Sequence, residues 1–228
     1  MEKRLVLIPA LLSLAVTLLR LTGELLRWSE AWFSTATGGI APSRVSWVLG
    51  VTWLAAPFGA YFGWRLVGLG EMPPRPARAI ALALLGAAGG WLGLRLAREL
   101  PIPFPLWLVP LWLVMAAAAA AQLAGWPALF RTLLLYGFAS RIPVVLVMFL
   151  AMAGNWGTHY DYVGMPEPFR MPFAPRFLWL AFFPQLVFWL GFTIVVGSLA
   201  GSVSGALAAR RVSADEVAHP ATDRFRVE

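Results

Sequence analysis

The charged residues of this chain fall in clusters, and long apolar segments separate the clusters. A segment of 18 or more apolar residues with few charges is long enough to cross a bilayer as a helix. The longest segments without Asp, Glu, Lys or Arg are residues 45–64, 79–94, 101–130, 142–160 and 177–209. With the apolar run after Arg4, the pattern predicts about six membrane helices in one bundle, over residues 4–33, 46–64, 79–94, 106–124, 131–153 and 184–208.

Composition supports the same class. Hydrophobic residues make up 60% of the 228-residue chain and the mean hydropathy is +0.73, whereas soluble domains contain about 45–50% apolar residues. We therefore expect an all-α polytopic membrane protein with its transmembrane domain over residues 1–209. Residues 210–228 are polar, mixed in charge and without periodicity, which predicts a disordered tail.

Prolines and glycines refine the predicted bundle. Pro57 and Pro143 fall inside predicted helices, and a proline in a helix interior removes a hydrogen bond and favours a kink. Glycines spaced four residues apart let two helices approach closely, either within the bundle or between two copies. The glycines in such pairs include Gly59, Gly63, Gly86, Gly90, Gly93, Gly197, Gly201 and Gly205.

The basic residues indicate orientation rather than a nucleic-acid partner. The net charge is +7 and nearly all of it comes from arginines at the ends of predicted helices, where they contact anionic headgroups. Arg65, Arg75 and Arg78 surround one short loop, and Arg210-Arg211 ends the last helix. This distribution favours a plasma (inner) membrane protein with both termini in the cytoplasm. The expected partners are the lipid bilayer and other membrane subunits or a second copy, with no nucleic acid.

A polar stripe follows one face of the first predicted helix. At 100° per residue its members fall within about 80° of one another. The stripe faces either the bundle interior or a water-filled cleft, or it belongs to a helix that leaves the membrane and solvates its charged end. The stripe consists of Ser13, Thr17, Arg20, Glu24 and Arg27.

Arg141 is the one charge near the middle of a predicted membrane helix, about 15 Å from the start of that helix. A buried guanidinium needs partners. Ser140 offers a hydroxyl, Pro143 leaves the Ala139 carbonyl without its helical donor, and Glu24 is a possible counter-ion. Three interpretations stay open: a structural clamp on a proline-broken helix, an interfacial position, and a site for an anion or a lipid headgroup.

A polar segment, residues 154–162, follows the same helix and contains Asn155, His159 and Asp161. In extended chain His159 and Asp161 share one face, and a carboxylate can orient an imidazole for metal binding or proton transfer. Glu167 is the nearest candidate for a third ligand. The alternatives are a structured loop held at the interface by its aromatic residues, and a docking surface for a partner or ligand.

The chain lacks several kinds of functional group. It has no cysteine, no P-loop and no HExxH or GxSxG motif, and no carboxylate lies in the middle of a predicted span. We therefore expect no cofactor and no metal. The leading hypothesis is an accessory or scaffold subunit of a membrane complex, or a homo-oligomer. The alternatives are a channel or uncoupled transporter for an anionic or lipid-like substrate, and a membrane enzyme that uses His159 and Asp161.

Overall fold

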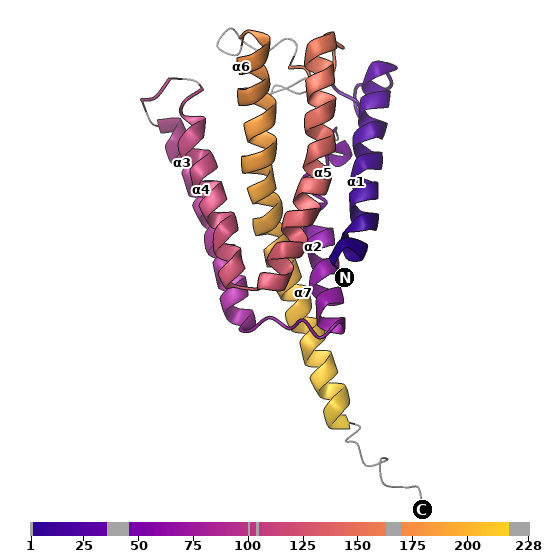
Figure 1. Ribbon diagram of the computed structural model, residues 1–228, viewed down its shortest axis with the longest axis vertical. Helices are drawn as coiled ribbons and strands as arrows, with labels where there is room; N and C mark the ends of the chain where they lie inside the picture. Colours follow the sequence, from indigo (N-terminus) through magenta and orange to yellow (C-terminus); the bar gives the residue numbers. More distant parts are fainter. Residues whose placement is uncertain (1, 36–45, 100, 104, 163–169, 219–228) are drawn as a thin grey trace, which may run out of the picture.

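The computed structural model describes residues 2–35, 46–99, 101–103, 105–162 and 170–218, and every regular element in these ranges is helical. Figure 1 shows the helices packed as one elongated bundle. In chain order the elements are α1 (Glu2–Leu25), the 3₁₀ turn η1 (Ser46–Leu49), α2 (Ala55–Gly68), α3 (Pro76–Glu99), α4 (Leu108–Ala121), the 3₁₀ turn η2 (Gln122–Ala124), α5 (Pro127–Gly154), α6 (Phe173–Phe177), the π-helical segments η4 (Leu178–Phe182) and η5 (Pro184–Trp189), and α7 (Leu190–Ala218).

Four helical stretches are long and apolar enough to cross a membrane: Arg4–Leu25, Pro76–Ala97, Pro127–Gly154 and Phe173–Arg211. The all-helical class agrees with the expectation, and these four helices suggest a membrane protein. The 14 residues of α2 extend about 21 Å, less than the roughly 30 Å of a bilayer core. Leu108–Ala124 is also shorter than the four. The structure therefore supports four candidate spans, and six spans stay a prediction.

The first residues of α1 and the C-terminal half of α7 lie at the same end of the bundle, the lower end in Figure 1. We call this the terminal end and the opposite end the distal end. Helix α6 and the last turns of α1 and α5 lie at the distal end. The start of α1 and the C-terminal half of α7 therefore lie toward the same end of the bundle. The membrane and the side on which the termini lie stay a prediction.

Helix α1 ends at Leu25, earlier than the predicted end at residue 33. Arg27 has a φ of 53°, a left-handed conformation that stops a right-handed helix. The Trp28 amide donates to the Gly23 carbonyl at 2.9 Å, as in a Schellman-type helix end. The Phe33 ring occupies the space that a side chain at position 23 would need. The chain thus turns back over its own glycine.

The second predicted helix, over residues 46–64, is interrupted. The turn η1 and an irregular stretch precede α2, which begins at Ala55. Pro57 therefore lies in the first turn of α2, where a missing amide hydrogen costs little because that amide has no helical acceptor. The structure places Pro57 at a helix start rather than at an interior kink. Pro143 lies inside α5, and a kink there stays a prediction.

Other helix ends also differ from the predicted ones. Helices α3 and α5 begin at Pro76 and Pro127, a position that suits proline because its fixed φ matches a helix. Helix α7 continues to Ala218, so the predicted disordered tail is helical over residues 210–218, because extending a packed helix requires no new nucleation. Residues 219–228 lie outside the described residues.

Helices α2 and α7 form the closest interface of the bundle. Gly59 lies against the backbone of Gly197, and Gly63 lies against the backbone of Gly201. The hydroxyl of Ser204 donates to the Ala60 carbonyl at 2.7 Å. A side chain at either α2 position would overlap main-chain atoms of α7, so glycine allows this approach.

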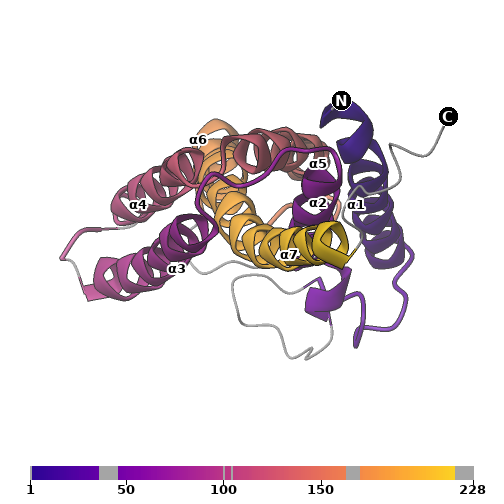
Figure 2. The same ribbon diagram turned by 90° about the horizontal axis from the view of Figure 1, so that it is seen from below.

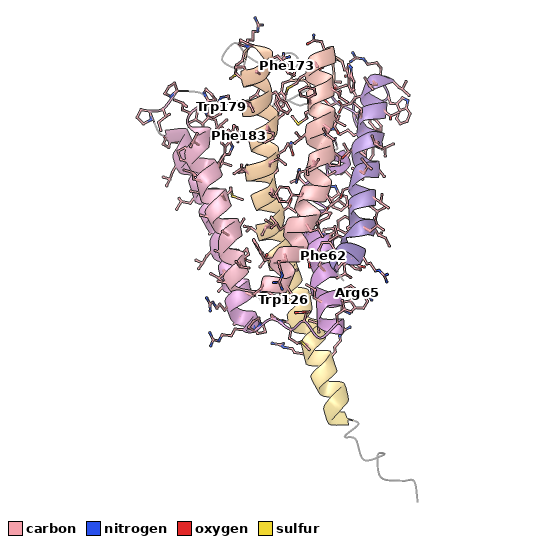
Figure 3. All side chains as sticks on the ribbon, viewed as in Figure 1. Phe62, Arg65, Trp126, Phe173, Trp179 and Phe183 are labelled. Atoms are coloured by element: carbon pink, nitrogen blue, oxygen red, sulfur yellow. The ribbon has the colours of Figure 1, made fainter. Side chains whose placement is uncertain are left out.

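Helices α3 and α4 form a hairpin on one side of α7, and α1 lies on the other side against α5 (Figure 2). Gly90 of α3 lies against the Met115 sulfur of α4, and Gly93 lies against Val114. Gly86 lies against Gln122 and Val195. At the distal end Trp112 of α4 stacks on Trp179, with ring centroids 5.2 Å apart. Figure 3 labels Phe173, Trp179 and Phe183 near this end.

Candidate functional site

The polar stripe of α1 faces the interior of the bundle. Ser13 and Thr17 are 0% and 1% exposed. The Ser13 hydroxyl lies 2.9 Å from the Tyr136 hydroxyl on α5, and the Tyr160 hydroxyl donates to the Thr17 carbonyl at 3.4 Å. A spacing of four residues places these groups above one another on one helix face. Arg27 is exposed and follows the end of α1, so it does not belong to this buried face.

Glu24 is the centre of a buried ion network at the distal end of α1. One carboxylate oxygen lies 2.9 Å from Nε of Arg20 and 2.6 Å from Nδ1 of His159. The other oxygen accepts a hydrogen bond from the backbone amide of His159 at 2.9 Å. Glu24, considered as a possible counter-ion of Arg141, contacts Arg20 and His159 near the distal end of α1, whereas Arg141 lies in the middle of α5.

Asp161, which the sequence places beside His159, accepts hydrogen bonds from the backbone of its own loop. Its Oδ2 accepts the backbone amides of Gly157 at 2.6 Å and Thr158 at 3.2 Å. These bonds close the loop around Gly157, whose φ is 69°. A carboxylate in contact with the imidazole comes from Glu24, which is 135 residues away in the chain.

His159 lies between charged and aromatic groups. Its ring centroid is 3.8 Å from that of Tyr160. Burial lowers the pKa of His159, and the contact with Glu24 opposes this effect. Burial also raises the pKa of Tyr160.

Asn155 has a different role, because it ends α5. Its φ of 46° is a left-handed conformation, and its backbone amide donates to the Ala151 carbonyl.

Arg141 is 2% exposed and faces another helix rather than open space. Its Nη1 donates to Oε1 of Gln185 and its Nη2 donates to the Thr193 hydroxyl, both at 3.3 Å. The guanidinium carbon lies 5.7 Å from the centroid of the Trp189 ring. In the described part of the chain no carboxylate pairs with Arg141, so neutral oxygens and a ring face hold this charge between α5 and the η5–α7 helix.

The local partners expected for Arg141 are not the ones it uses. Its hydrogen bonds run to η5 and α7 rather than to the Ala139 carbonyl. The Ser140 hydroxyl donates to the Gly137 carbonyl at 3.0 Å. Arg141 therefore links two helices instead of compensating for the broken hydrogen bond at Pro143.

Sequence reasoning missed the three residues that contact Arg141. Gln185, Trp189 and Thr193 recur every four residues in the charge-free run over 177–209, so they share one helix face. Gln185 is the only side-chain amide in that run. An isolated amide in an apolar span needs a hydrogen-bond partner, and this was the available signal. Two of the three lie in the π-helical segment η5, an irregularity that is frequent at functional sites.

The described residues contain no group of three or more His, Cys, Asp or Glu side chains that could hold a metal ion. Glu167, considered as a third ligand beside His159 and Asp161, lies outside the described residues. The polar groups inside the bundle connect helices. The Glu24 network connects α1 to the loop after α5, and Arg141 connects α5 to η5 and α7.

The geometry defines the class of the molecule as an all-helical protein whose four long apolar helices suggest insertion in a membrane. Comparisons with protein-family models, with curated proteins and with solved structures find no match to the chain. Its function is therefore inferred from its own surfaces.

Proposed function

We propose that the protein is an accessory subunit of a membrane complex, and that it docks a transmembrane helix of another protein against α4. The observation that carries this proposal is a smooth, exposed face of alanines on α4 and η2, which we call the alanine face. Its members are Ala116, Ala117, Ala120, Ala121 and Ala124, and all of them are exposed.

A groove runs beside the alanine face and has a volume of about 290 Å³. Ala116 and Ala120 form one wall, and Phe130 of α5 and Ile194 of α7 contribute to the others. Apolar atoms line almost all of it. The face and the groove together give a membrane partner both a flat contact and a channel for its larger side chains.

A helix fits this surface better than lipid chains do. Small residues spaced four apart allow two helix backbones to approach closely and gain packing contacts, whereas a flexible acyl chain gains little from alanine in place of leucine. The stretch Leu108–Ala124 is also only about 25 Å long. A helix shorter than the hydrocarbon core is accommodated in part by association with other helices.

The test is a steric block on the alanine face. In Ala120→Leu a larger side chain projects into the contact, and in Ala15→Leu the same change occurs on an exposed position of α1. After purification in a gentle detergent, native mass spectrometry of the wild type and of Ala15→Leu should show one defined partner protein. Ala120→Leu should lose it.

The chain contains no cysteine, so a single cysteine at position 117 gives an unambiguous cross-link to whatever contacts the face. A cross-link to a second copy of the chain would replace the proposed partner by a homo-oligomer. A wild-type chain that stays a lone monomer without cross-links would refute docking on this face.

The transporter alternative assigned Arg141 to the lining of a path for anions or lipids. Its burial against Gln185 and Thr193 favours a role in holding two helices together. The enzyme alternative depends on His159, whose imidazole contacts the carboxylate of Glu24.

A further inference from the structure

A second open site lies at the terminal end of the bundle, away from the alanine face. It is a cavity of about 420 Å³ between the last turns of α2 and the C-terminal half of α7. Figure 3 shows Arg65, one of the residues that line it, at this end. We call it the terminal cavity. The side chains that the argument uses are Trp64, Arg65, Leu69, Leu207 and Arg211.

The terminal cavity follows from the way α2 and α7 cross. The two helices touch backbone to backbone at Gly59 and Gly63, and α2 then ends at Gly68 whereas α7 continues to Ala218. Apart from its chain neighbours and the backbone of its own helix, no described atom lies within 4 Å of the place where a side chain at Gly68 would begin. The space below the crossing is therefore left open by the fold itself.

Among the lining residues that the structure describes, the charged ones are both basic. They are Arg65 and Arg211, and both are exposed. The guanidinium carbon of Arg65 lies 5.8 Å from the Trp64 ring centroid, a contact that holds the charge beside the cavity. Two guanidinium groups without a carboxylate between them are suited to an anion with several oxygens, because each can donate two parallel hydrogen bonds.

Apart from Ser204, the other described residues that line the cavity are apolar, and several of them are open to the surroundings. Trp64 is 56% exposed, Leu207 is 54% exposed and Leu69 is 40% exposed. The charge-free run of the last helix ends at Ala209, just before Arg210 and Arg211. An apolar run that ends at arginines is typical of the boundary between the hydrocarbon region and the polar headgroups. A ligand here meets arginines on one side and exposed apolar side chains on the other.

We propose that the terminal cavity binds a phospholipid with an anionic headgroup. The phosphate is held between Arg65 and Arg211, and the upper part of an acyl chain lies along Trp64 and Leu207. A lipid explains both halves of the lining, whereas a free phosphate would use the arginines alone. Tryptophan beside a basic residue at a membrane interface is also typical of such contacts.

The test uses the full chain, stripped of lipid in a mild detergent and titrated with phosphatidylglycerol or phosphatidylcholine. Native mass spectrometry counts the bound lipids, and thermal unfolding reports stabilisation. Each arginine near an anionic headgroup strengthens binding roughly fivefold, so the variant with Arg65→Gln and Arg211→Gln should bind phosphatidylglycerol roughly 25-fold more weakly. The wild type should prefer phosphatidylglycerol to phosphatidylcholine.

The matched control replaces Arg75 and Arg78, two exposed arginines near the same end of the bundle that do not line the cavity. This control has the same net charge as the test variant and should bind phosphatidylglycerol like the wild type. A loss as large as that of the test variant would show a diffuse basic surface and overturn the site. Equal binding of both lipids by the wild type would also overturn it. Competition by soluble glycerol phosphate at the concentrations where the lipid binds would overturn it as well, because the acyl chain would then contribute nothing to binding.

The variant with Arg65→Lys and Arg211→Lys provides a check on folding. It keeps both positive charges, so it should retain most of the preference for phosphatidylglycerol. If the lysine variant folds, as judged by its helical circular dichroism, and yet shows no preference between the two lipids, the cavity does not recognise a charged headgroup.

Discussion

Replacing Arg141 by methionine removes the guanidinium and keeps a side chain of similar length between α5 and α7. The variant loses two hydrogen bonds of 3.3 Å and the contact with the Trp189 ring. Hydrogen bonds between membrane helices contribute about 0.6 kcal/mol each on average, and a cation on a ring face contributes about 1 kcal/mol. The expected loss in unfolding free energy is therefore about 2 kcal/mol.

Two further variants separate charge from volume. Arg141→Ala also removes the packed stem of the side chain, and truncation of a long buried side chain typically costs 2–5 kcal/mol, so it should be clearly less stable than Arg141→Met. Ile142→Met makes a comparable change at the neighbouring residue, which is 46% exposed on the outside of α5. That control should stay within about 0.5 kcal/mol of the wild type.

The assay is unfolding by a denaturing detergent in mixed micelles, followed by tryptophan fluorescence. A double-mutant cycle of Arg141→Met with Gln185→Leu should give a coupling of about 0.6 kcal/mol. If Arg141→Met is as stable as the wild type and shows no coupling to Gln185→Leu, Arg141 does not hold α5 and α7 together. If the same variant also changed anion flux in liposomes, Arg141 would belong to a transport path instead.

Three other predictions concern the contacts of α1, α2 and the loop after α5. Glu24→Ala leaves the His159 amide and the adjacent arginine without a buried carboxylate, so it should cost about 3 kcal/mol of unfolding free energy, whereas Glu30→Ala at an exposed position should change it by less than about 0.5 kcal/mol. Because burial lowers the pKa of His159 below the usual value of about 6.5, the unfolded chain binds a proton first, and stability should fall as the pH drops from about 6.5 toward the lowered value; His159→Asn should remove that part of the pH dependence. Gly63→Ala places a methyl group into the backbone of α7 and should cost about 1–3 kcal/mol, whereas Gly89→Ala meets no neighbour and should be neutral or slightly stabilising.

Each of these predictions can fail in a distinct way. Equal effects of Glu24→Ala and Glu30→Ala would mean that the buried ion network contributes no stability. A rise in stability on acidification that His159→Asn abolishes would mean that the contact with Glu24 outweighs burial. If a reaction of the protein is found, unchanged activity in His159→Asn would exclude the enzyme hypothesis. Equal stability of Gly63→Ala and Gly89→Ala would mean that α2 and α7 can separate without loss.

Much of the helical architecture was predictable because bilayer length and charge clustering act on local sequence. The helix starts at Pro76 and Pro127 were missed by three or four residues, although proline favours a first turn. The end of α1 depends on a tertiary contact, since Phe33 folds back over Gly23. No periodicity near residue 25 indicates that reversal.

The polar contacts were less predictable than the helices. The helical periodicity of α1 grouped Ser13, Thr17 and Glu24 on one face, and all three are buried. It did not indicate which residues they contact. His159 pairs with a residue 135 positions earlier, and Arg141 pairs with neutral side chains inside a charge-free run. Pattern reasoning looks for opposite charges nearby in the sequence, and both networks in this bundle are built from distant or uncharged partners.

The distance in sequence between Glu24 and His159 sets an order of events during synthesis. At about 5–20 residues per second, the ribosome needs roughly 7–27 s to produce the 135 residues between them. Throughout that interval the first helix carries a carboxylate whose later partner does not yet exist, and the pair with Arg20 one turn away is the neutralisation available to it. The Arg20–Glu24 pair therefore offers the Glu24 carboxylate a counter-charge within α1 before the loop after α5 has been synthesised.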